Sequence, residues 1–438
     1  MFLFLEGPHG PFYRVLAQAL AARGAAVRRI LLNRADAAEW GRGLPATRFT
    51  GTPEVFPEWL AQQIDALGVT DIVLYGDSRP VHQVALAEAK TRGITTHILE
   101  EGYVRPRFVT YERQGTNAFS RLCEISLPRM AEAVGQVGPP DEQGPNDTWG
   151  DSRQHLMWSC LYYIRLALGW RAAGAYGGAR GVPVWQEIGW YAMRAMVLPY
   201  VRLRRAIKQR RLIRSGKTFH LVLLQLSFDA SMRVHSDYEN TAAFVEEVID
   251  AFAEGAPGDH LLVFKAHPFD NGRERLRRVI RSLAVDLGVA DRVIFIDGGK
   301  RLARLMDAAR SAITVNSTGA QQALWRGLPV VATGRSIYRK PGLTSEQSLA
   351  GFFRHPRRPD LRAYWIFRKF TITATQLTGS FYAKAGITRL LAALPDAMMQ
   401  PQDPYERVLG QKPSKTGTGT LTRPSLIVSN VDRAQNLR

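Results

Sequence analysis

The chain has 438 residues, which is enough for two domains of ordinary size. Its 58 Lys and Arg against 39 Asp and Glu give a formal net charge of +19, which favours an anionic partner such as nucleic acid, an acidic membrane surface or a phosphorylated substrate. Two cysteines exclude a disulfide framework, and no apolar run approaches the roughly 20 residues of a membrane-spanning helix. We expect a cytoplasmic protein, because the apolar start at 1–5 lacks the basic flank of a signal peptide.

Residues 1–120 alternate short apolar runs with amphipathic helical patterns. The apolar runs predict strands at 2–6, 26–32, 71–75 and 95–99. The helical patterns predict helices at 11–23, 57–67 and 80–91. Repeated strand–helix–strand units predict a parallel, doubly wound sheet, and therefore an N-terminal Rossmann-like domain over 1–120.

Two glycine-containing loops follow strands of this domain, one at 6–10 and one at 76–82. Such loops lead into helix N-termini and suit contacts with phosphate or carboxylate groups, although each is weak evidence alone. The candidates that they contribute to a cleft are Gly7, Asp77, Arg79 and His82.

The segment Glu100-Glu101-Gly102-Tyr103-Val104-Arg105-Pro106 follows the last of these strands. Open α/β sheets bind ligands beyond the carboxyl ends of their strands, so we expect Glu100, Glu101 and Arg105 near a crevice. Successive strand residues point to opposite faces, and only one of the two glutamates should face it. Which one does so stays open, and a solvated acidic turn is the alternative interpretation.

Residues 121–217 break the alternation and predict a helical insert rich in Trp and Tyr. Nine basic residues and no acid lie between Arg194 and Lys217, interleaved with apolar side chains. This pattern is typical of a helix on an anionic membrane surface, and equally of a solvated helix. Nucleic acid is not favoured as a partner, because no recognition motif accompanies the charge.

Residues 218–340 form a second alternating unit. The expected strands are 219–226, 260–265, 292–297, 312–316 and 329–333, and the expected helices are 240–253, 273–287, 301–309 and 318–326. Two Rossmann-like domains joined by a helical insert predict a GT-B-like α/β fold, with the domains facing across a cleft. Helices over 341–407 should pack back on the hinge, and the polar composition of 408–438 predicts a disordered tail.

The run Asn316-Ser317-Thr318-Gly319 is the most specific stretch of the second unit. It places three hydrogen-bonding side chains between a strand and a helix, an arrangement that suits an anion. Lys265 and His267 end another strand of the same sheet and could hold, or protonate, a phosphate leaving group.

Gln225 and Asp229 end the first strand of the second unit, on the side expected to face the first. Asp229 together with Glu101 or Glu100 could flank the anomeric centre of a sugar and supply the nucleophile and the acid/base of a retaining displacement. No Asp-x-Asp pair stands out at a strand end, so we expect a metal-independent site.

Over residues 1–340 the chain resembles the capsule polysaccharide biosynthesis/export family, specifically its KpsS-like β-Kdo glycosyltransferases. The resemblance rests on the order of short motifs: Glu6-Gly7-Pro8, Gly76-Asp77-Ser78-Arg79, Glu100 to Pro106, Thr110-Tyr111-Glu112, Gly115-Thr116-Asn117, Gln225 with Asp229, Lys265-Ala266-His267-Pro268 and Asn316 to Gly319.

This resemblance implies a retaining transferase that uses CMP-β-Kdo as donor substrate and no other cofactor. It also implies a lysophosphatidylglycerol acceptor, a peripheral position on the cytoplasmic face of the inner membrane, and a link to the capsule export machinery. By resemblance, Asp229 matches the nucleophile and Glu101 the acid/base. His267 and Lys265 match the CMP phosphate site, and Asn316, Ser317 and Thr318 the donor loop.

Two other functions remain open from the sequence. A nucleotide-sugar epimerase or hydrolase could share the fold without a lipid acceptor. A non-enzymatic scaffold of capsule export could use the basic insert alone, although it would have no need of carboxylates and a His-Pro pair at strand ends.

Overall fold

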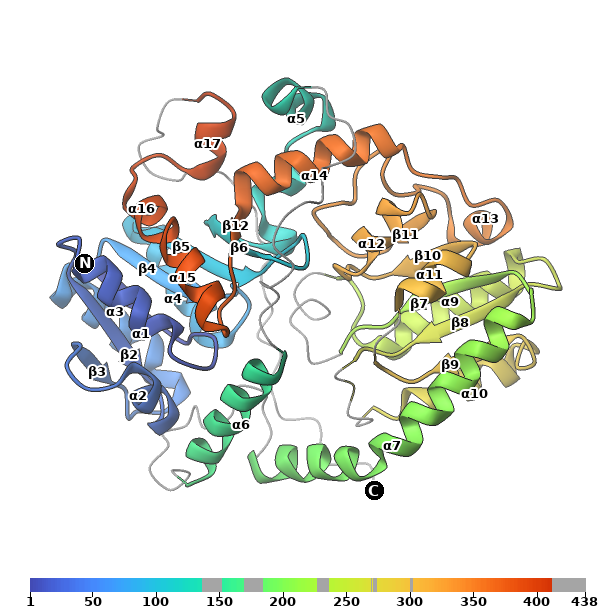
Figure 1. Ribbon diagram of the computed structural model, residues 1–438, viewed down its shortest axis with the longest axis horizontal. Coiled ribbons are helices and arrows are strands. Elements are labelled where there is room, and N and C mark those ends of the chain that lie inside the picture. Colours follow the sequence, from blue (N-terminus) through green and yellow to red (C-terminus); the bar gives the residue numbers. More distant parts are fainter. Residues whose placement is uncertain are drawn as a thin grey trace.

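The computed structural model describes residues 1–135, 152–168, 184–226, 236–268, 270, 274–299 and 302–411. Figure 1 shows two α/β halves side by side, the first in blue and the second in yellow and orange. Helix α14 crosses between them along one edge, and helices α6 and α7 run along the opposite edge. The predicted fold class, GT-B-like with two Rossmann-like halves and a helical insert, is confirmed.

The first half is built on a seven-stranded sheet of order β12-β6-β5-β4-β1-β2-β3. Its strands are β1 (Phe2–Phe4), β2 (Val27–Leu31), β3 (Ala46–Arg48), β4 (Asp71–Tyr75), β5 (Thr95–Glu101), β6 (Phe108–Arg113) and β12 (Gln376–Thr378). Its helices are α1 (Phe12–Ala21), α2 (Arg34–Trp40), α3 (Phe56–Leu67) and α4 (Pro80–Arg92), with short 3-10 turns at Pro53–Val55, Asn117–Phe119 and Arg121–Cys123. Separate apolar cores cover the two faces of the sheet, as expected for parallel strands buried on both sides.

One prediction for this half is wrong, because its sheet is not wholly parallel. Strand β6 runs antiparallel to β5, and β12 runs antiparallel to β6. The chain reverses at Gly102 without a crossover helix, and a Cβ at Gly102 would lie 2.2 Å from the Phe108 carbonyl oxygen. Only glycine permits that close approach. Helix α2 and strand β3 were not predicted, because both are too short to show a clear apolar period.

The second half has a parallel five-stranded sheet of order β11-β10-β7-β8-β9. The strands are β7 (Phe219–Leu223), β8 (Leu261–Lys265), β9 (Val293–Ile296), β10 (Ser311–Thr314) and β11 (Val330–Ala332). The helices are α9 (Thr241–Gly255), α10 (Leu276–Asp286), α11 (Leu302–Ala308) and α12 (Ala320–Trp325). All five predicted strands are present, shortened by one to three residues.

After the second sheet the chain returns to the first half. This part contains α13 (Leu349–Arg354), α14 (Leu361–Thr375), β12, α15 (Lys384–Leu391), α16 (Leu394–Met399) and α17 (Pro404–Val408). Phe367 and Phe370 of α14 are fully buried in one apolar core with Tyr103 and Leu122 of the first half. The packing of α14 therefore fixes how the two halves sit against each other.

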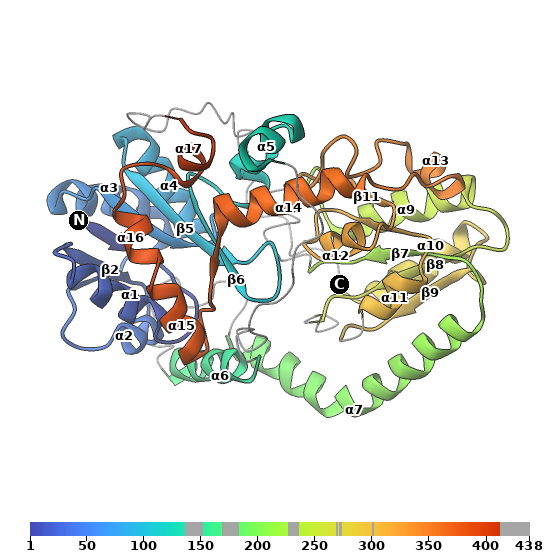
Figure 2. The same cartoon turned by 45° about the horizontal axis from the view of Figure 1, so that its top comes forward.

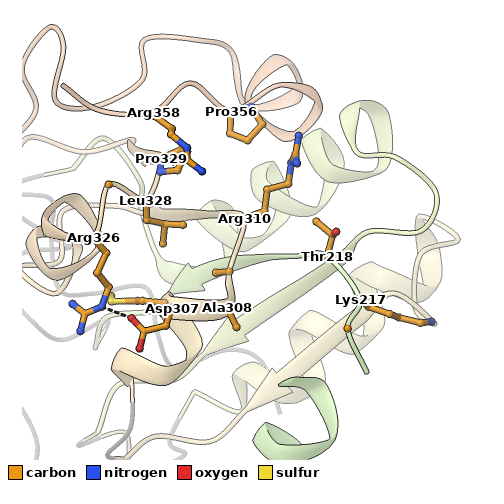
Figure 3. Close-up of a pocket in the computed structure, with 14 residues that line it drawn as sticks. Lys217, Thr218, Asp307, Ala308, Arg310, Arg326, Leu328, Pro329, Pro356 and Arg358 are labelled. Atoms are coloured by element: carbon orange, nitrogen blue, oxygen red, sulfur yellow. Dashed lines mark hydrogen bonds and ion pairs between the residues drawn. The ribbon is translucent and has the colours of Figure 1, made fainter. Parts of the chain in front are cut away.

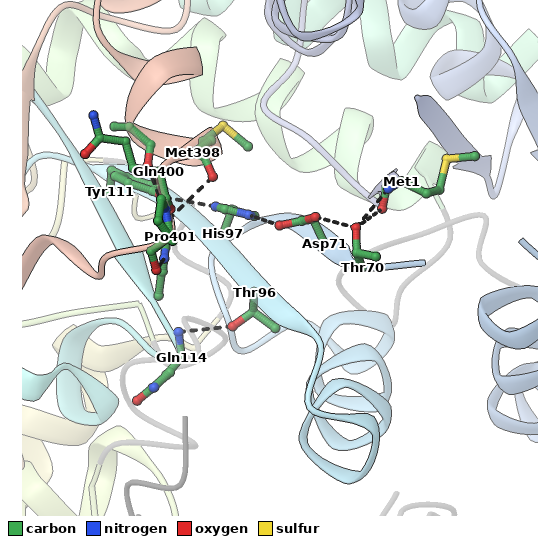
Figure 4. Close-up of polar contacts among 12 residues, drawn as sticks. Met1, Thr70, Asp71, Thr96, His97, Tyr111, Gln114, Met398, Gln400 and Pro401 are labelled. Atoms are coloured by element: carbon green, nitrogen blue, oxygen red, sulfur yellow. Dashed lines mark hydrogen bonds and ion pairs between the residues drawn. The ribbon is translucent and has the colours of Figure 1, made fainter. Parts of the chain in front are cut away.

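Buried polar contacts hold the end of this returning segment (Figure 4). The Arg113 guanidinium donates to the carbonyl oxygens of Gln400 at 2.5 Å and Pro401 at 3.1 Å. Beside it, His97 bridges Tyr111 at 2.9 Å and Asp71 at 2.8 Å. These contacts satisfy buried polar groups, which is what a buried arginine and histidine require.

The insert contains α5 (Leu127–Val134), α6 (Ser152–Leu168) and α7 (Val184–Arg214). Helix α6 packs on the first half, where the Tyr162 ring stacks on His9 at 4.2 Å. Figure 2 shows α7 bent in its middle, and Pro199 inside this helix removes a backbone hydrogen bond. Within the described ranges, no helix is both long and apolar enough to cross a membrane.

The proposed domain limits at 120, 217, 340 and 407 stay predictions. The predicted disordered tail falls almost wholly on residues 412–438, which lie outside the described residues.

Candidate functional site

A narrow crevice lies where the two halves meet. The first half contributes Tyr103 and Asn117, and the second contributes Asn316, Thr318 and the segment 335–338. Its cavity volume is about 10 Å³, which is room for at most a single water molecule. The run 316–319 and the segment after β5, which the sequence placed at two separate sheet edges, therefore meet in one place.

The loop after β10 is held by a dense set of hydrogen bonds. The Gln225 and Asn316 amides bond twice, from Gln225 Nε2 to Asn316 Oδ1 at 2.7 Å and from Asn316 N to Gln225 Oε1 at 3.1 Å. The Ser317 hydroxyl accepts from Gly319 N at 3.2 Å, and the Ser317 carbonyl accepts from the Tyr338 hydroxyl at 2.7 Å. The loop thus has a defined shape, which the Gln225 side chain helps to hold, and the donor-binding role of Gln225 stays a prediction.

A buried hydrogen bond ties this loop region to the first half. Gln321 of α12 donates from Nε2 to the Tyr103 carbonyl oxygen at 3.0 Å, and Tyr364 of α14 donates to the Gln321 carbonyl at the same distance. From the other side, the Asn117 backbone N–H donates to the Tyr103 hydroxyl at 2.6 Å. Tyr103 is therefore fixed at both its backbone and its ring.

Glu100 and Glu101 point to different surroundings. Glu100 accepts hydrogen bonds from the Asn117 side-chain amide at 3.1 Å and the Thr116 hydroxyl at 3.3 Å, which connects it to the crevice. Glu101 accepts from the Tyr75 hydroxyl at 3.3 Å, on the side covered by α6. The alternation expected along a strand is present, and both carboxylates lie at the carboxyl edge of the sheet.

Tyr382 and His155 complete the surroundings of Glu101. The hydroxyls of Tyr75 and Tyr382 lie 3.3 Å apart, and the His155 ring stacks on Tyr382 at 4.1 Å. Burial, and then the charge of Glu101, raises the pKa of the Tyr382 phenol. Burial also lowers the pKa of His155. Both groups are therefore neutral at pH 7, and Glu101 has neutral hydrogen-bonding neighbours.

The two glycine-containing loops of the first half lie next to this cluster. Arg79 pairs with buried Glu6 at 3.1 Å, and its guanidinium lies over the Tyr75 ring. Asp77 is buried and accepts from Thr116 N at 2.9 Å. Arg79 and Asp77 thus link neighbouring loops at the carboxyl edge of the sheet.

His82 and Gly7 have structural positions. His82 donates from Nδ1 to the Gly76 carbonyl at 2.8 Å, and burial, followed by the charge of Arg79, lowers its pKa to about 3. A Cβ at Gly7 would lie 2.6 Å from the Tyr13 ring, which explains the glycine without a ligand.

On the second half, Lys265 and His267 differ in their surroundings. Lys265 is buried, and its ammonium donates to the carbonyls of Ala266 at 3.1 Å and Asp297 at 2.9 Å. Burial, followed by the positive charges of Arg105 and Lys265, lowers the pKa of His267 to about 4. His267 is consequently neutral at pH 7, and the charge of Arg105 reaches it from the other half.

Asp229, the predicted nucleophile, lies outside the described residues. Among the residues that are described, no group of three or more His, Cys, Asp or Glu side chains could hold a metal ion.

The sequence of residues 70–382 matches the family described as capsule polysaccharide biosynthesis protein. The chain belongs to this family. The predicted family is thus confirmed, on a match that covers the second half, the first half from β4 to β12, and every residue lining the crevice.

Two relatives of the chain illustrate the relationship. The chain is 29% identical over 392 residues to the capsule polysaccharide export protein KpsS of Escherichia coli, covering 87% of this chain and 96% of KpsS. It is 30% identical over 397 residues to the capsule polysaccharide modification protein LipB of Neisseria meningitidis serogroup A, covering 87% and 91%.

Solved structures show more distant likenesses. The β-Kdo 2,7 transferase of Thermosulfurimonas dismutans KpsC superposes with a TM-score of 0.40 at 13% identity, covering 89% of this chain and 98% of that one. The lipopolysaccharide glycosyltransferase WaaG gives 0.33 at 14%, covering 91% and 100%. Likenesses this distant carry no argument about activity.

Several residues of the candidate site were not predicted from the sequence. The cluster around Glu101 joins positions up to 307 residues apart, namely Tyr75, His155 and Tyr382. No local sequence pattern indicates that these three side chains meet. Arg335 and Tyr338 follow β11, and a strand-end loop was the available signal for both.

Glu112 of β6 is the buried support of Tyr103. Its carboxylate accepts from the hydroxyls of Tyr103 and Ser120, each at 2.6 Å, and from the hydroxyl of Tyr405. Burial raises the pKa of Glu112 from its ordinary 4.5 to about 7, against the lowering effect of these three donors. The position of the crevice wall therefore depends on a carboxyl group that titrates near neutrality.

We predict that Glu112→Gln flattens the pH dependence of stability. Because Glu112 binds its proton more tightly in the folded state, its contribution is complete below pH 4.5 and is lost as the pH rises to about 7. The free energy of unfolding of the unmodified protein should fall about 3 kcal/mol more than that of the variant between pH 4.5 and pH 8. Urea unfolding at both pH values measures this, and equal losses in the two proteins would contradict it. Glu39, whose pKa burial raises to about 8, contributes equally to both.

Proposed function

We propose that this chain is a retaining β-Kdo glycosyltransferase that transfers Kdo from CMP-β-Kdo to a lysophosphatidylglycerol acceptor and so initiates the linker of a capsular polysaccharide. The observation that carries the proposal is the meeting of the loop 316–319 with Tyr103 and Asn117 across the two halves. It occurs in a capsule-family chain related over most of its length to KpsS. Bisubstrate transfer needs such a site, with one substrate held by each half.

The second half is proposed to bind the donor. CMP-Kdo carries a phosphate and a carboxylate, and the crevice offers Asn316, Thr318 and the exposed cation Arg335. Guanidinium groups bind such oxyanions well. Because the crevice has a volume of only about 10 Å³, donor binding requires it to widen.

His267 and Arg105 are proposed to assist the departure of CMP. A neutral imidazole can donate one N–H to a phosphate oxygen, and Arg105 adds positive charge where negative charge develops. Lys265 is proposed to add positive charge without contacting the phosphate, because its buried ammonium already donates hydrogen bonds to two backbone carbonyls.

The proposed chemistry is a double displacement. Asp229 forms a bond to the anomeric carbon of Kdo as the bond from that carbon to the CMP phosphate oxygen breaks. The acceptor hydroxyl oxygen then bonds to the same carbon, the bond to Asp229 breaks, and the hydroxyl proton passes to Glu101. The neutral phenol of Tyr75 is proposed to orient Glu101, while Glu100 orients Asn117.

We predict that Asp229→Ala and Glu101→Gln each slow transfer by at least about 100-fold, because each removes a group that bonds to substrate or moves a proton. The assay is mass spectrometry of lysophosphatidylglycerol after incubation with CMP-Kdo, where the product is heavier by one Kdo. Glu254→Gln, on the exposed face of α9, is the matched control. Undiminished transfer in Asp229→Ala would refute the nucleophile. CMP release without a lipid product would instead indicate a hydrolase, and no release at all a scaffold.

We also propose that α7 rests on an anionic membrane. An apolar stripe at helical spacing is 44–76% exposed, and it comprises Met193, Met196, Val197, Tyr200, Leu203 and Ile207. Exposed arginines at 202, 210, 211 and 214 lie along and beyond it. Arg205 and Lys208 instead hold the carbonyls of Gly298 and Phe295 in the second half. This combination is typical of a helix lying in the membrane interface.

We predict that Arg210→Glu/Arg211→Glu releases the protein from vesicles of phosphatidylglycerol, because these arginines supply the electrostatic attraction. Met196→Asp/Leu203→Asp should release it even at low salt, because these apolar side chains insert into the membrane interface. Vesicle co-sedimentation measures both. Arg354→Glu/Arg357→Glu makes the same charge change at exposed positions in and just after α13, away from α7. If the control variant is released from the vesicles to the same extent, binding depends only on the net charge of the protein, and α7 is not the surface that contacts the membrane.

A further inference from the structure

A second cavity lies at the opposite edge of the second sheet from the crevice. It opens at the amino ends of β7, β10 and β11 and has a volume of about 780 Å³. Strand β7 separates the two sites by roughly 16 Å, at about 3.3 Å per residue. This cavity is therefore not part of the proposed donor site, and a volume of this size is typical of a small-molecule pocket.

Four basic side chains from four separate segments line the cavity (Figure 3). Lys217 precedes β7, Arg310 precedes β10, Arg326 follows α12, and Arg358 precedes α14. In Figure 3, Arg310 and Arg358 reach to either side of Pro356. Residues far apart in the chain thus bring positive charge to one concave surface.

This charge is poorly neutralised. Asp307 is the one carboxylate among the described lining residues, and it already binds Arg326 at 2.7 Å. Within the described part of the chain, the side chains of Lys217, Arg310 and Arg358 have no hydrogen bond or ion pair. Like charges around one cavity repel each other, so an anion bound there would gain attraction and relieve this repulsion.

Two buried histidines close to the cavity are subject to the same charge. His220 and His260 lie 3.0 Å apart, and His220 also bonds the Ser311 hydroxyl at 2.7 Å. Burial is the main cause of the lowered pKa of both rings, and the positive charge of Arg310 adds to it in each case. The positive potential therefore extends from the cavity into the sheet.

We propose that this basic cavity binds a small anion carrying several phosphate or carboxylate groups. Its volume exceeds what a single phosphate fills, and its cations are spread over four segments. None of the described lining residues is aromatic, so recognition rests on charged groups and not on stacking of a base. This binding site is separate from the proposed transfer reaction.

Isothermal titration calorimetry with inorganic tripolyphosphate and with citrate tests the proposal. We expect saturable binding that Arg310→Ala/Arg358→Ala weakens at least 10-fold. The control Arg278→Ala/Arg281→Ala removes the same charge from exposed positions on α10 and should change affinity less than 3-fold. Binding of both anions would indicate recognition of negative charge in general. Binding of tripolyphosphate alone would indicate a phosphorylated ligand.

Two results would overturn the proposal. One is the absence of saturable binding of either anion to the unmodified protein. The other is an equal loss in the cavity variant and the control, which would mean nonspecific attraction to a basic protein. The single variant Lys217→Ala, at an exposed position before β7, repeats the comparison with a milder change and guards against a folding defect in the double variant.

Discussion

The return of the chain from the second sheet to the first is the constraint on which the rest of the structure depends. Helix α14 carries Phe367 and Phe370 into an apolar core shared with Tyr103. Strand β12 then pairs with β6, and the Gln376 amide bonds Val104 N at 3.3 Å and the Thr110 hydroxyl at 3.0 Å. The segment after β5 is therefore held in place by β12, which follows the second half in the chain.

This arrangement explains why the crevice forms where it does. Tyr103 is fixed by Glu112 on its ring and by Gln321 on its carbonyl, so one residue couples the first sheet, the loop region after β10 and α14. The adjacent carboxylates then divide the edge of the sheet between them. Glu100 faces Asn117 and the crevice, while Glu101 faces the phenols beneath α6. In the proposed transfer reaction, donor and acceptor would approach this edge from different sides.

Much of the fold could be predicted because buried parallel strands are short apolar runs bounded by Gly, Pro or charged residues. The same logic placed Glu100, His267 and Asn316 at strand ends. It failed at β6 and β12, whose antiparallel pairing depends on a tight turn at Gly102 and on a partner more than 260 residues away. It also left the basic helix undecided, since only tertiary contacts show that Arg205 binds the second half while Leu203 faces outward.

Hydrogen exchange with and without CMP is the measurement that tests whether the proposed nucleotide site is assembled from both halves. We expect slower amide exchange on CMP binding in two separate segments, 102–119 of the first half and 315–338 of the second, because Tyr103 and Asn117 face Asn316 and Arg335. Protection confined to the second half, or located at the basic cavity around Arg310, would contradict a site shared between the two halves.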